Sequence, residues 1–295
     1  MTRFLREVFT FADAQASGLS KNQLRGARYH QVCRGVYTTG NPDAIEIRAQ
    51  AALLAGGPKA LLAGLTVLRF LGVWLPQVYA EDKHIHINMP PGASGPTHEF
   101  IIVTRSTVVL EPVELWDILG LMGVHPAQAW LQAANYLDHD DLIVAADALM
   151  RRQYPISTRP EIDHAVGCIS GSRGVSKARR ALKLARAGVD SPMETRLRLA
   201  LVAHGLPCPE VNLPLRPQPD GPLYYLDMAY PAIKLAVEYD GAGHAATRQQ
   251  MQRDQFRRRV IEDAGWRIIT ATAADSRDWS GVVASVCAGL NARLR

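Results

Sequence analysis

The sequence has few cysteines and no hydrophobic run long enough to cross a membrane, and we expect no secretory leader from its first residues. Its four cysteines lie far apart without a C-x-x-C pair, so we expect reduced thiols rather than a zinc module or a disulfide framework. The longest apolar stretch, 60–75, is interrupted by Arg69 and is shorter than the ~20 residues of a membrane-spanning helix. Charged residues interrupt the first ten positions, namely Arg3, Arg6 and Glu7. We therefore expect a cytoplasmic protein without a membrane partner.

Positive charge is present in modest excess, and it is concentrated in two segments. The net charge is +5. Residues 1–40 carry six Lys or Arg against two Asp or Glu, and residues 151–189 carry nine against two, whereas the segment between them is acidic. A polyanion such as DNA would meet these two basic segments first. The alternative is that both segments are solvated surfaces without a partner.

The first thirty residues show the signals of two short helices. Thr10 can cap a first helix together with Asp13, and Gly18 is placed to end it. Ser20 and Gln23 form an S-x-x-Q capping box at the start of a second helix. That helix would expose side chains of the types that bind phosphates and base edges, namely Lys21, Asn22, Arg25 and Arg28.

A hairpin is expected after the second helix. The stretch 31–37 has alternating apolar residues around a central Arg-Gly pair, which is the pattern of a wing, and Arg34 is a further candidate for DNA contact. The runs LSKNQL (19–24) and RGVY (34–37) resemble the N-terminal winged helix of AbiEi-type antitoxin and regulator proteins. The resemblance implies a winged helix-turn-helix over 1–40 that binds double-stranded DNA, for example at a toxin-operon promoter.

Residues 41–190 are expected to form an α/β region that connects the two ends of the chain or forms a dimer, which leaves an oligomer open. The periodicity predicts helices over 45–55 and 60–71 and from Pro112 onward, with strands over 84–88 and 100–103.

Three patterns in this region resemble functional sites. His84 and His86 share one strand face, but no third ligand is nearby in the sequence, so a solvated strand edge is favoured over a metal site. The run DHDD (138–141) precedes an apolar helix and fits a capping turn. The helix 175–187 is either a strut that contacts phosphates or a solvated face, because it has no acid and five basic residues, Lys177, Arg179, Arg180, Lys183 and Arg186.

Residues 191–295 follow a more specific order of elements. The pattern predicts a helix over 192–204, three strands, a second helix and a last strand, the later elements covering 210–215, 223–229, 234–240, 247–264 and 266–270. This α-β-β-β-α-β order is the core of the PD-(D/E)XK nucleases. The expected fold class is therefore α/β, with a winged helix, a middle platform and a restriction-endonuclease-like C-terminal domain.

Acidic residues of the second and third strands converge if these strands form a hairpin. A turn midway between Ala232 and Ile233 places Asp227 opposite Glu238, because the two are equidistant from that midpoint. Asp240 projects to the same face, two residues beyond Glu238. Like charges on one face repel unless a cation neutralises them, so we expect Mg²⁺ (or Mn²⁺) on these three carboxylates. A solvent-exposed acidic face is the alternative.

Glu194 and His244 are the remaining candidates for chemistry. Glu194 completes an S-x-x-E capping box with Ser191, which is a sufficient structural explanation. It also shares a helical stripe with Leu197 and Leu201, so the same side chain can lean toward the sheet and reach the metal. His244 follows a glycine-rich turn after the acidic strand, where it is either incidental or able to transfer a proton.

Four segments together resemble a family related to the very short patch repair endonucleases, namely SPME (191–194), LDMA (226–229), VEYDG with its histidine (237–244) and GWRII (265–269). The resemblance implies Asp227 and Glu238 as metal ligands, Glu194 as a supporting acid, and Asp240 and His244 as the rest of the catalytic set. Asp240 stands where PD-(D/E)XK proteins typically have lysine, which leaves the water-activating group open.

The sequence as a whole predicts a DNA-binding protein with a metal-dependent endonuclease-like domain that hydrolyses phosphodiester bonds. Arg253 and Arg257 would hold the DNA strand. The alternative is a non-enzymatic, antitoxin-like transcriptional regulator in which a degenerate nuclease fold only binds DNA.

Overall fold

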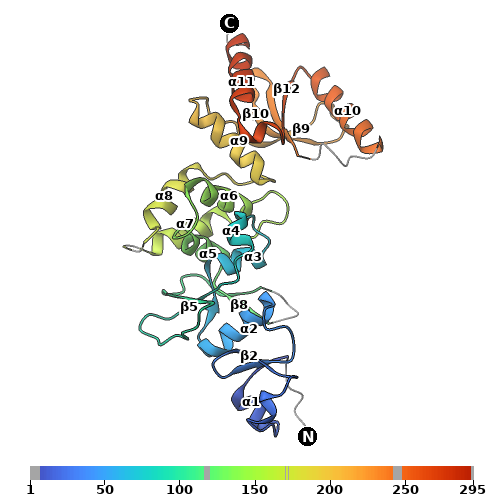
Figure 1. Ribbon diagram of the computed structural model, residues 1–295. Helices are drawn as coiled ribbons and strands as arrows, with labels where there is room; N and C mark the ends of the chain where they lie inside the picture. The colour runs from blue at the N-terminus through green and yellow to red at the C-terminus, as the bar shows by residue number, and fades with distance from the viewer. Residues whose placement is uncertain (1–6, 116–119, 170, 172, 242–247, 294–295) are drawn as a thin grey trace. The chain divides into compact units, whose positions relative to one another are not determined.

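The chain is a mixed α/β protein whose elements form three β-sheets. The computed structural model describes residues 7–115, 120–169, 171, 173–241 and 248–293 (Figure 1). Contacts divide the chain into two compact units: residues 1–138 with 160–179, and residues 139–159 with 180–295. Within the described ranges, no helix is both long and apolar enough to cross a membrane.

A small three-stranded sheet opens the first unit. Its elements are β1 (Val8–Thr10), α1 (Phe11–Ala16), β2 (His30–Cys33) and β3 (Val36–Thr38). Strand β3 lies between β1 and β2 and is antiparallel to both. The predicted capping pair is confirmed, because the Asp13 N–H donates to Thr10 Oγ1 at 3.1 Å and the Thr10 N–H donates to Asp13 Oδ2 at 2.9 Å. The predicted hairpin is also present, with Gly35 at φ +77 in its turn.

The predicted second helix is wrong in length, because only a 3₁₀ turn forms at Gln23–Arg25. Both bonds of its capping box are present, between Ser20 and Gln23. The chain then becomes extended at Gly26, and glycine is a poor helix former. Leu24 is the turn's one buried residue and packs with Phe9, so no apolar stripe supports further helical turns.

A five-stranded sheet forms the rest of the first unit. Its order is β6-β5-β4-β8-β7, with parallel pairs β5–β6 and β4–β8. The elements are α2 (Ile45–Gly56), β4 (Leu61–Leu62), α3 (Gly64–Phe70), α4 (Gln77–Ala80), β5 (Ile85–Met89), β6 (Ile101–Arg105), β7 (Val113–Glu114), β8 (Met122–Gly123), α5 (Pro126–Ala133) and α7 (Arg159–Cys168).

Two helix predictions in this region need correction. The apolar run 60–71 begins as strand β4 and becomes helical only at Gly64, because β4 is the central strand of the sheet. Helices do not return at Pro112, since β7 and β8 come first. A short apolar run fits a fully buried strand as well as a buried helix, so periodicity alone does not separate the two.

The solvated strand edge expected at His84 and His86 is wrong for His86, whereas His84 is exposed and precedes the strand. Strand β5 lies between β6 and β4, and the His86 side chain is buried, with its ring edge-on to Tyr136 at 4.8 Å. Burial lowers the pKa of His86 to about 4, so this imidazole is neutral at physiological pH. His84 instead bonds Asp82, with 2.5 Å between Nδ1 and Oδ1.

The second unit begins with α6 (His139–Leu149), so the apolar helix expected after the run 138–141 is present but begins inside that run. Asp140 and Asp141 lie in its first turn, as acids at a helix N-terminus should. The basic helix is α8 (Val175–Leu184), which is shorter than predicted and has residues in both units. Arg179, Arg180 and Lys183 are exposed on it, whereas Lys177 and Arg186 donate to backbone carbonyls.

A four-stranded sheet organises the second unit. Its order is β12-β11-β10-β9, antiparallel except for the parallel pair β11–β12. The predicted α-β-β-β-α-β order is confirmed, with one further helix after it: α9 (Pro192–Ala203), β9 (Glu210–Leu215), β10 (Tyr224–Tyr230), β11 (Leu235–Asp240), α10 (Arg248–Asp263), β12 (Arg267–Thr272) and α11 (Ser280–Arg293).

Helices cover both faces of this sheet (Figure 1). On one face, Leu197 and Leu201 of α9 and Val286 of α11 pack against Met228 and Val237 of the central strands. On the other face, side chains of α10 and β12 pack against the small residues of β10 and β11, forming a core that includes Ile261, Trp266, Ala229 and Ala236. The polar ends of β10 and β11 lie beyond this second core.

Candidate active site

The β10–β11 hairpin has the register that the sequence predicts. Met228 pairs with Val237 and Tyr230 with Leu235, so the two strands are symmetric about the midpoint between Ala232 and Ile233. The tight connection is a 3₁₀ turn at Pro231–Ile233 followed by Lys234 in the left-handed region. The next position along this register brings Asp227 beside Glu238.

Asp227 is largely enclosed at the centre of the site. The Tyr239 backbone N–H donates to its Oδ2 at 2.9 Å, which fixes the carboxylate against β11. Burial, together with the negative charge of Glu238, raises the pKa of Asp227 to about 6, although the Tyr239 bond opposes the shift. A carboxylate in this state gains stability from any cation placed next to it.

Glu194 caps its helix as the sequence predicts, and its side chain is also buried close to Asp227. The Glu194 N–H donates to Ser191 Oγ at 3.2 Å, and its side-chain Oε2 accepts from the Asp190 N–H at 3.3 Å, so it caps helix α9. The side chain is also only 8% exposed, and burial followed by repulsion from Asp227 raises its pKa to about 7. Helix α9 therefore places a second carboxylate close enough to Asp227 for the two negative charges to repel each other.

Glu238 is neutralised by a residue of this chain. Arg257 of α10 donates from Nη1 to Glu238 Oε2 at 2.9 Å and from Nη2 to Oε1 at 2.6 Å, which is a two-pronged ion pair. Its Nη2 also donates to the Tyr225 carbonyl at 2.7 Å. The sequence predicts a DNA contact for Arg257 and a metal for Glu238. The structure instead joins these two side chains directly.

Sequence reasoning missed a second ion pair beside the carboxylates. Arg152 lies 2.7 Å from Asp190, and its guanidinium stacks over the Tyr225 ring at 4.1 Å from the ring centre. The charge of Asp190 contributes to the raised pKa values of both Glu194 and Asp227. The only signal in the sequence was the basic excess of segment 151–189.

The metal ligands expected from the sequence are not gathered into one cluster. Among the described residues, no group of three or more His, Cys, Asp or Glu side chains is arranged to hold a metal ion. Asp240 is exposed at the end of β11, and His244 lies outside the described residues. Buried oxygen donors whose pKa values are raised suit a hard divalent cation, and Glu194 and Asp227 provide two of them. Glu238 would join them only by releasing Arg257.

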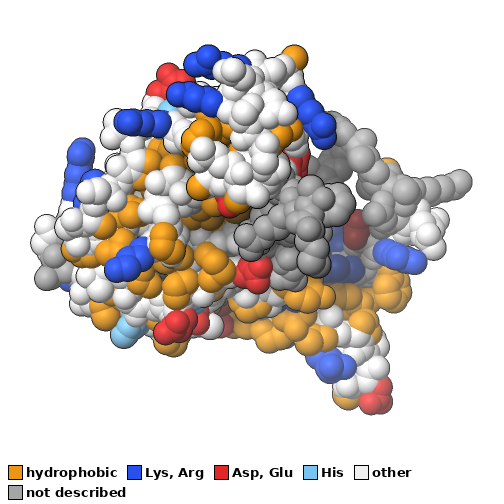
Figure 2. Space-filling model, turned by 90° about the horizontal axis from the view of Figure 1, so that it is seen from below, with side chains coloured by type: hydrophobic (Ala, Val, Ile, Leu, Met, Phe, Trp, Pro, Cys, Tyr) orange, Lys and Arg blue, Asp and Glu red, His pale blue; other side chains and the backbone are white. Residues whose placement is uncertain are grey.

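The nucleic-acid candidates divide between the two units. Arg253 is exposed on α10. In the first unit, the side chains of Lys21, Asn22, Arg25, Arg28 and Arg34 are all exposed. Figure 2 shows Lys and Arg side chains spread among hydrophobic ones on the face it presents, without a single dense patch.

Two relatives from Mycobacterium tuberculosis match most of the chain. Uncharacterized protein Rv2248 of strain ATCC 25618 / H37Rv and uncharacterized protein MT2308 of strain CDC 1551 / Oshkosh are each 28% identical over 263 residues, which is 89% of this chain and 92% of theirs. No protein-family model matches the chain, and no solved structure matches it significantly. The function is therefore inferred from the site itself.

Proposed function

We propose that residues 191–295 form a PD-(D/E)XK-type nuclease domain, similar to the very short patch repair endonucleases, that hydrolyses DNA phosphodiester bonds with Mg²⁺ or Mn²⁺. The observation that carries the proposal is the position of Asp227, whose carboxylate is close enough to Glu194 of α9 to raise that pKa and has its own pKa raised by Glu238 of β11. Carboxylates that are buried and repel one another are costly in a fold that gains nothing from them. Such groups are common at functional sites.

In this proposal the carboxylates position a divalent cation and the arginines position the DNA strand. Asp227 and Glu194 would hold the cation, with Glu238 joining once Arg257 turns away. The cation would polarise the phosphate and promote ionisation of a water molecule. Once released from Glu238, the planar guanidinium of Arg257 could donate two hydrogen bonds to the phosphate oxygens. The Tyr239 N–H keeps Asp227 in place throughout.

We assign DNA delivery to a winged-helix-like region at residues 1–40. The exposed basic residues of its 3₁₀ turn and hairpin would contact the phosphates of double-stranded DNA in the cytoplasm, for example at a toxin-operon promoter. Binding and cutting would then be carried by different units of the chain.

One observation favours the regulator alternative. The Arg257–Glu238 pair gives Glu238 a permanent cation, and a nuclease fold that has lost its chemistry could be stabilised by such a pair. In that case the protein binds DNA and represses transcription without cutting.

The two functions are separated by incubating the purified protein with plasmid DNA in Mg²⁺, Mn²⁺ or EDTA. The nuclease proposal predicts metal-dependent nicking that Asp227→Ala and Glu238→Ala both abolish while duplex binding survives. A wild type that cuts nothing in either metal, together with an Asp227→Ala variant that represses a promoter equally well, would establish the regulator instead.

A further inference from the structure

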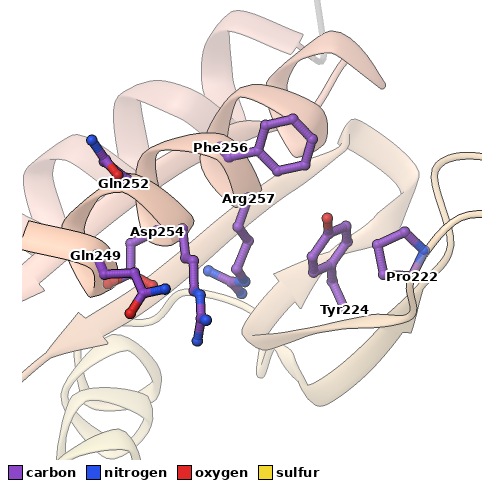
Figure 3. A pocket seen from close by; sticks show the side chains of 8 residues that line it. Pro222, Tyr224, Gln249, Gln252, Asp254, Phe256 and Arg257 are labelled. Atoms are coloured by element: carbon purple, nitrogen blue, oxygen red, sulfur yellow. The ribbon is translucent and has the colours of Figure 1, made fainter.

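An open pocket adjoins the carboxylate site on the α10 side of the sheet. It encloses about 560 Å³ between the first half of α10 and the start of β10. Figure 3 shows Phe256 and Arg257 on the helix, with Tyr224 and Pro222 on the facing segment. Arg257 lines this pocket and also holds Glu238, so the pocket and the carboxylates share a wall.

The pocket combines flat aromatic surface with polar groups that suit the edges of a nucleobase. Phe256 is 60% exposed, which leaves much of a large apolar side chain in water. Tyr224 is half-buried, with its ring against the core that includes Leu226. Gln249, Gln252 and Asp254 line the pocket as well, and amide and carboxylate groups are those that pair with adenine and cytosine edges.

The charge of α10 supports a nucleic-acid ligand rather than an apolar one. Arg253 also lines the pocket, and Arg259 follows Phe256 by three positions on the same helix; both are exposed. Cations next to exposed aromatic rings are the combination that binds single strands, because the rings stack with bases while the cations follow the backbone.

We propose that this pocket binds an unpaired base of the DNA strand that is cut, so that the substrate contains a single-stranded nucleotide next to the scissile phosphate. The inference rests on the proposed nuclease function, because that function makes the neighbouring carboxylates the place where the strand is cut. A base inside a duplex already stacks on both faces and presents only its edges. An unpaired base has a free face for Phe256 or Tyr224.

The test measures binding without cleavage, by fluorescence anisotropy of a labelled single-stranded oligonucleotide and of the same strand in a perfect duplex, in EDTA. Phe256→Ala is expected to weaken single-strand binding about tenfold, the scale of one lost stacking contact. Duplex binding should not change. Phe256→Trp should restore the single-strand affinity. Repeating the series in an Arg25→Ala/Arg28→Ala background prevents residues 1–40 from hiding the effect.

Met251→Ala is the matched control. Met251 is 52% exposed on the same helix and is not among the pocket-lining residues, so its removal should leave both affinities unchanged. The proposal is overturned if Phe256→Ala binds the single strand as tightly as the wild type does, or if it loses duplex affinity to the same extent. Failure of the nuclease function looks different: Phe256 still governs single-strand binding, but the wild type cuts no DNA in Mg²⁺ or Mn²⁺.

Discussion

Replacing Arg257 by methionine removes the cation from Glu238 while keeping a side chain of similar length. The two bonds to Glu238 are short, and the side chains of Arg257 and Glu238 are 30% and 16% exposed. A hydrogen bond to a charged group contributes about 1.5–3 kcal/mol, and breaking a fully buried pair costs about 3–5 kcal/mol. Partial exposure places this pair near the lower range, so we expect a loss of about 2 kcal/mol in metal-free buffer.

Arg258→Met provides the control, because Arg258 is the next residue of α10 and pairs with Glu262 at 3.0 Å, with both side chains nearly half exposed. Its other bonds are longer than those of Arg257, 3.2 Å to Thr270 Oγ1 and 3.4 Å to the Ile268 carbonyl. An exposed pair at this i,i+4 spacing contributes only about 0.3–0.5 kcal/mol. The free energy of unfolding is measured by urea denaturation for the wild type and both variants in EDTA. Equal losses for Arg257→Met and Arg258→Met would refute the view that Arg257 neutralises a partly buried acid.

Mg²⁺ binding to the same three proteins tests whether Arg257 and the metal compete for Glu238. If Arg257 occupies a position that a divalent cation needs, Arg257→Met should bind Mg²⁺ more tightly than the wild type does. An affinity gain of about tenfold would add about 1.4 kcal/mol of stabilisation at saturating Mg²⁺. Equal stabilisation of the wild type and Arg257→Met by Mg²⁺ would show that Glu238 is not a ligand.

Three further predictions follow from the site and the first unit. The pKa of Glu194 is raised from 4.5 to about 7. Between these two pH values the folded protein keeps a proton on Glu194 that the unfolded chain releases. The free energy of unfolding therefore falls as pH rises from 4.5 to about 7. In metal-free buffer, the free energy of unfolding of the wild type should therefore fall more between about pH 5 and about pH 8 than that of Glu194→Gln does. The difference should reach up to about 3 kcal/mol. Parallel pH profiles for the two proteins would contradict this prediction. Mg²⁺ or Mn²⁺ should raise the melting temperature of the wild type but not of Asp227→Asn, as measured by differential scanning fluorimetry, and a wild type indifferent to millimolar metal would count against the site. Arg25→Ala/Arg28→Ala should weaken duplex binding and reduce its salt dependence in gel-shift assays, and unchanged binding would rule out residues 1–40 as the DNA contact.

Local patterns were enough to predict much of the second unit. The alternation of Leu235, Val237 and Tyr239 with Ala236, Glu238 and Asp240 places the two acids on the same face of β11, and the Pro231 turn fixes the register that brings Asp227 beside Glu238. The capping residues Thr10 and Ser191 were equally readable, because their partners lie three residues away.

Features that depend on distant parts of the chain could not be read in the same way. Leu61 and Leu62 form a strand only because β5 and β8 lie on either side of them. Nothing near Arg257 in the sequence identifies Glu238 as its partner, and Arg152 and Asp190 are joined only by the fold. Long-range ion pairs therefore changed the expected site more than any error in secondary structure did.

The central claim is that Asp227 is a catalytic carboxylate, and the most direct test is the rate of DNA cleavage by Asp227→Asn relative to the wild type. The substrate is a labelled DNA with one unpaired nucleotide, at protein concentrations that saturate binding for both proteins, in Mg²⁺ and in Mn²⁺. The account predicts cleavage by the wild type and none by Asp227→Asn, with binding retained. Equal cleavage rates for the two proteins would contradict it, as would a wild type that binds this DNA and never cuts it.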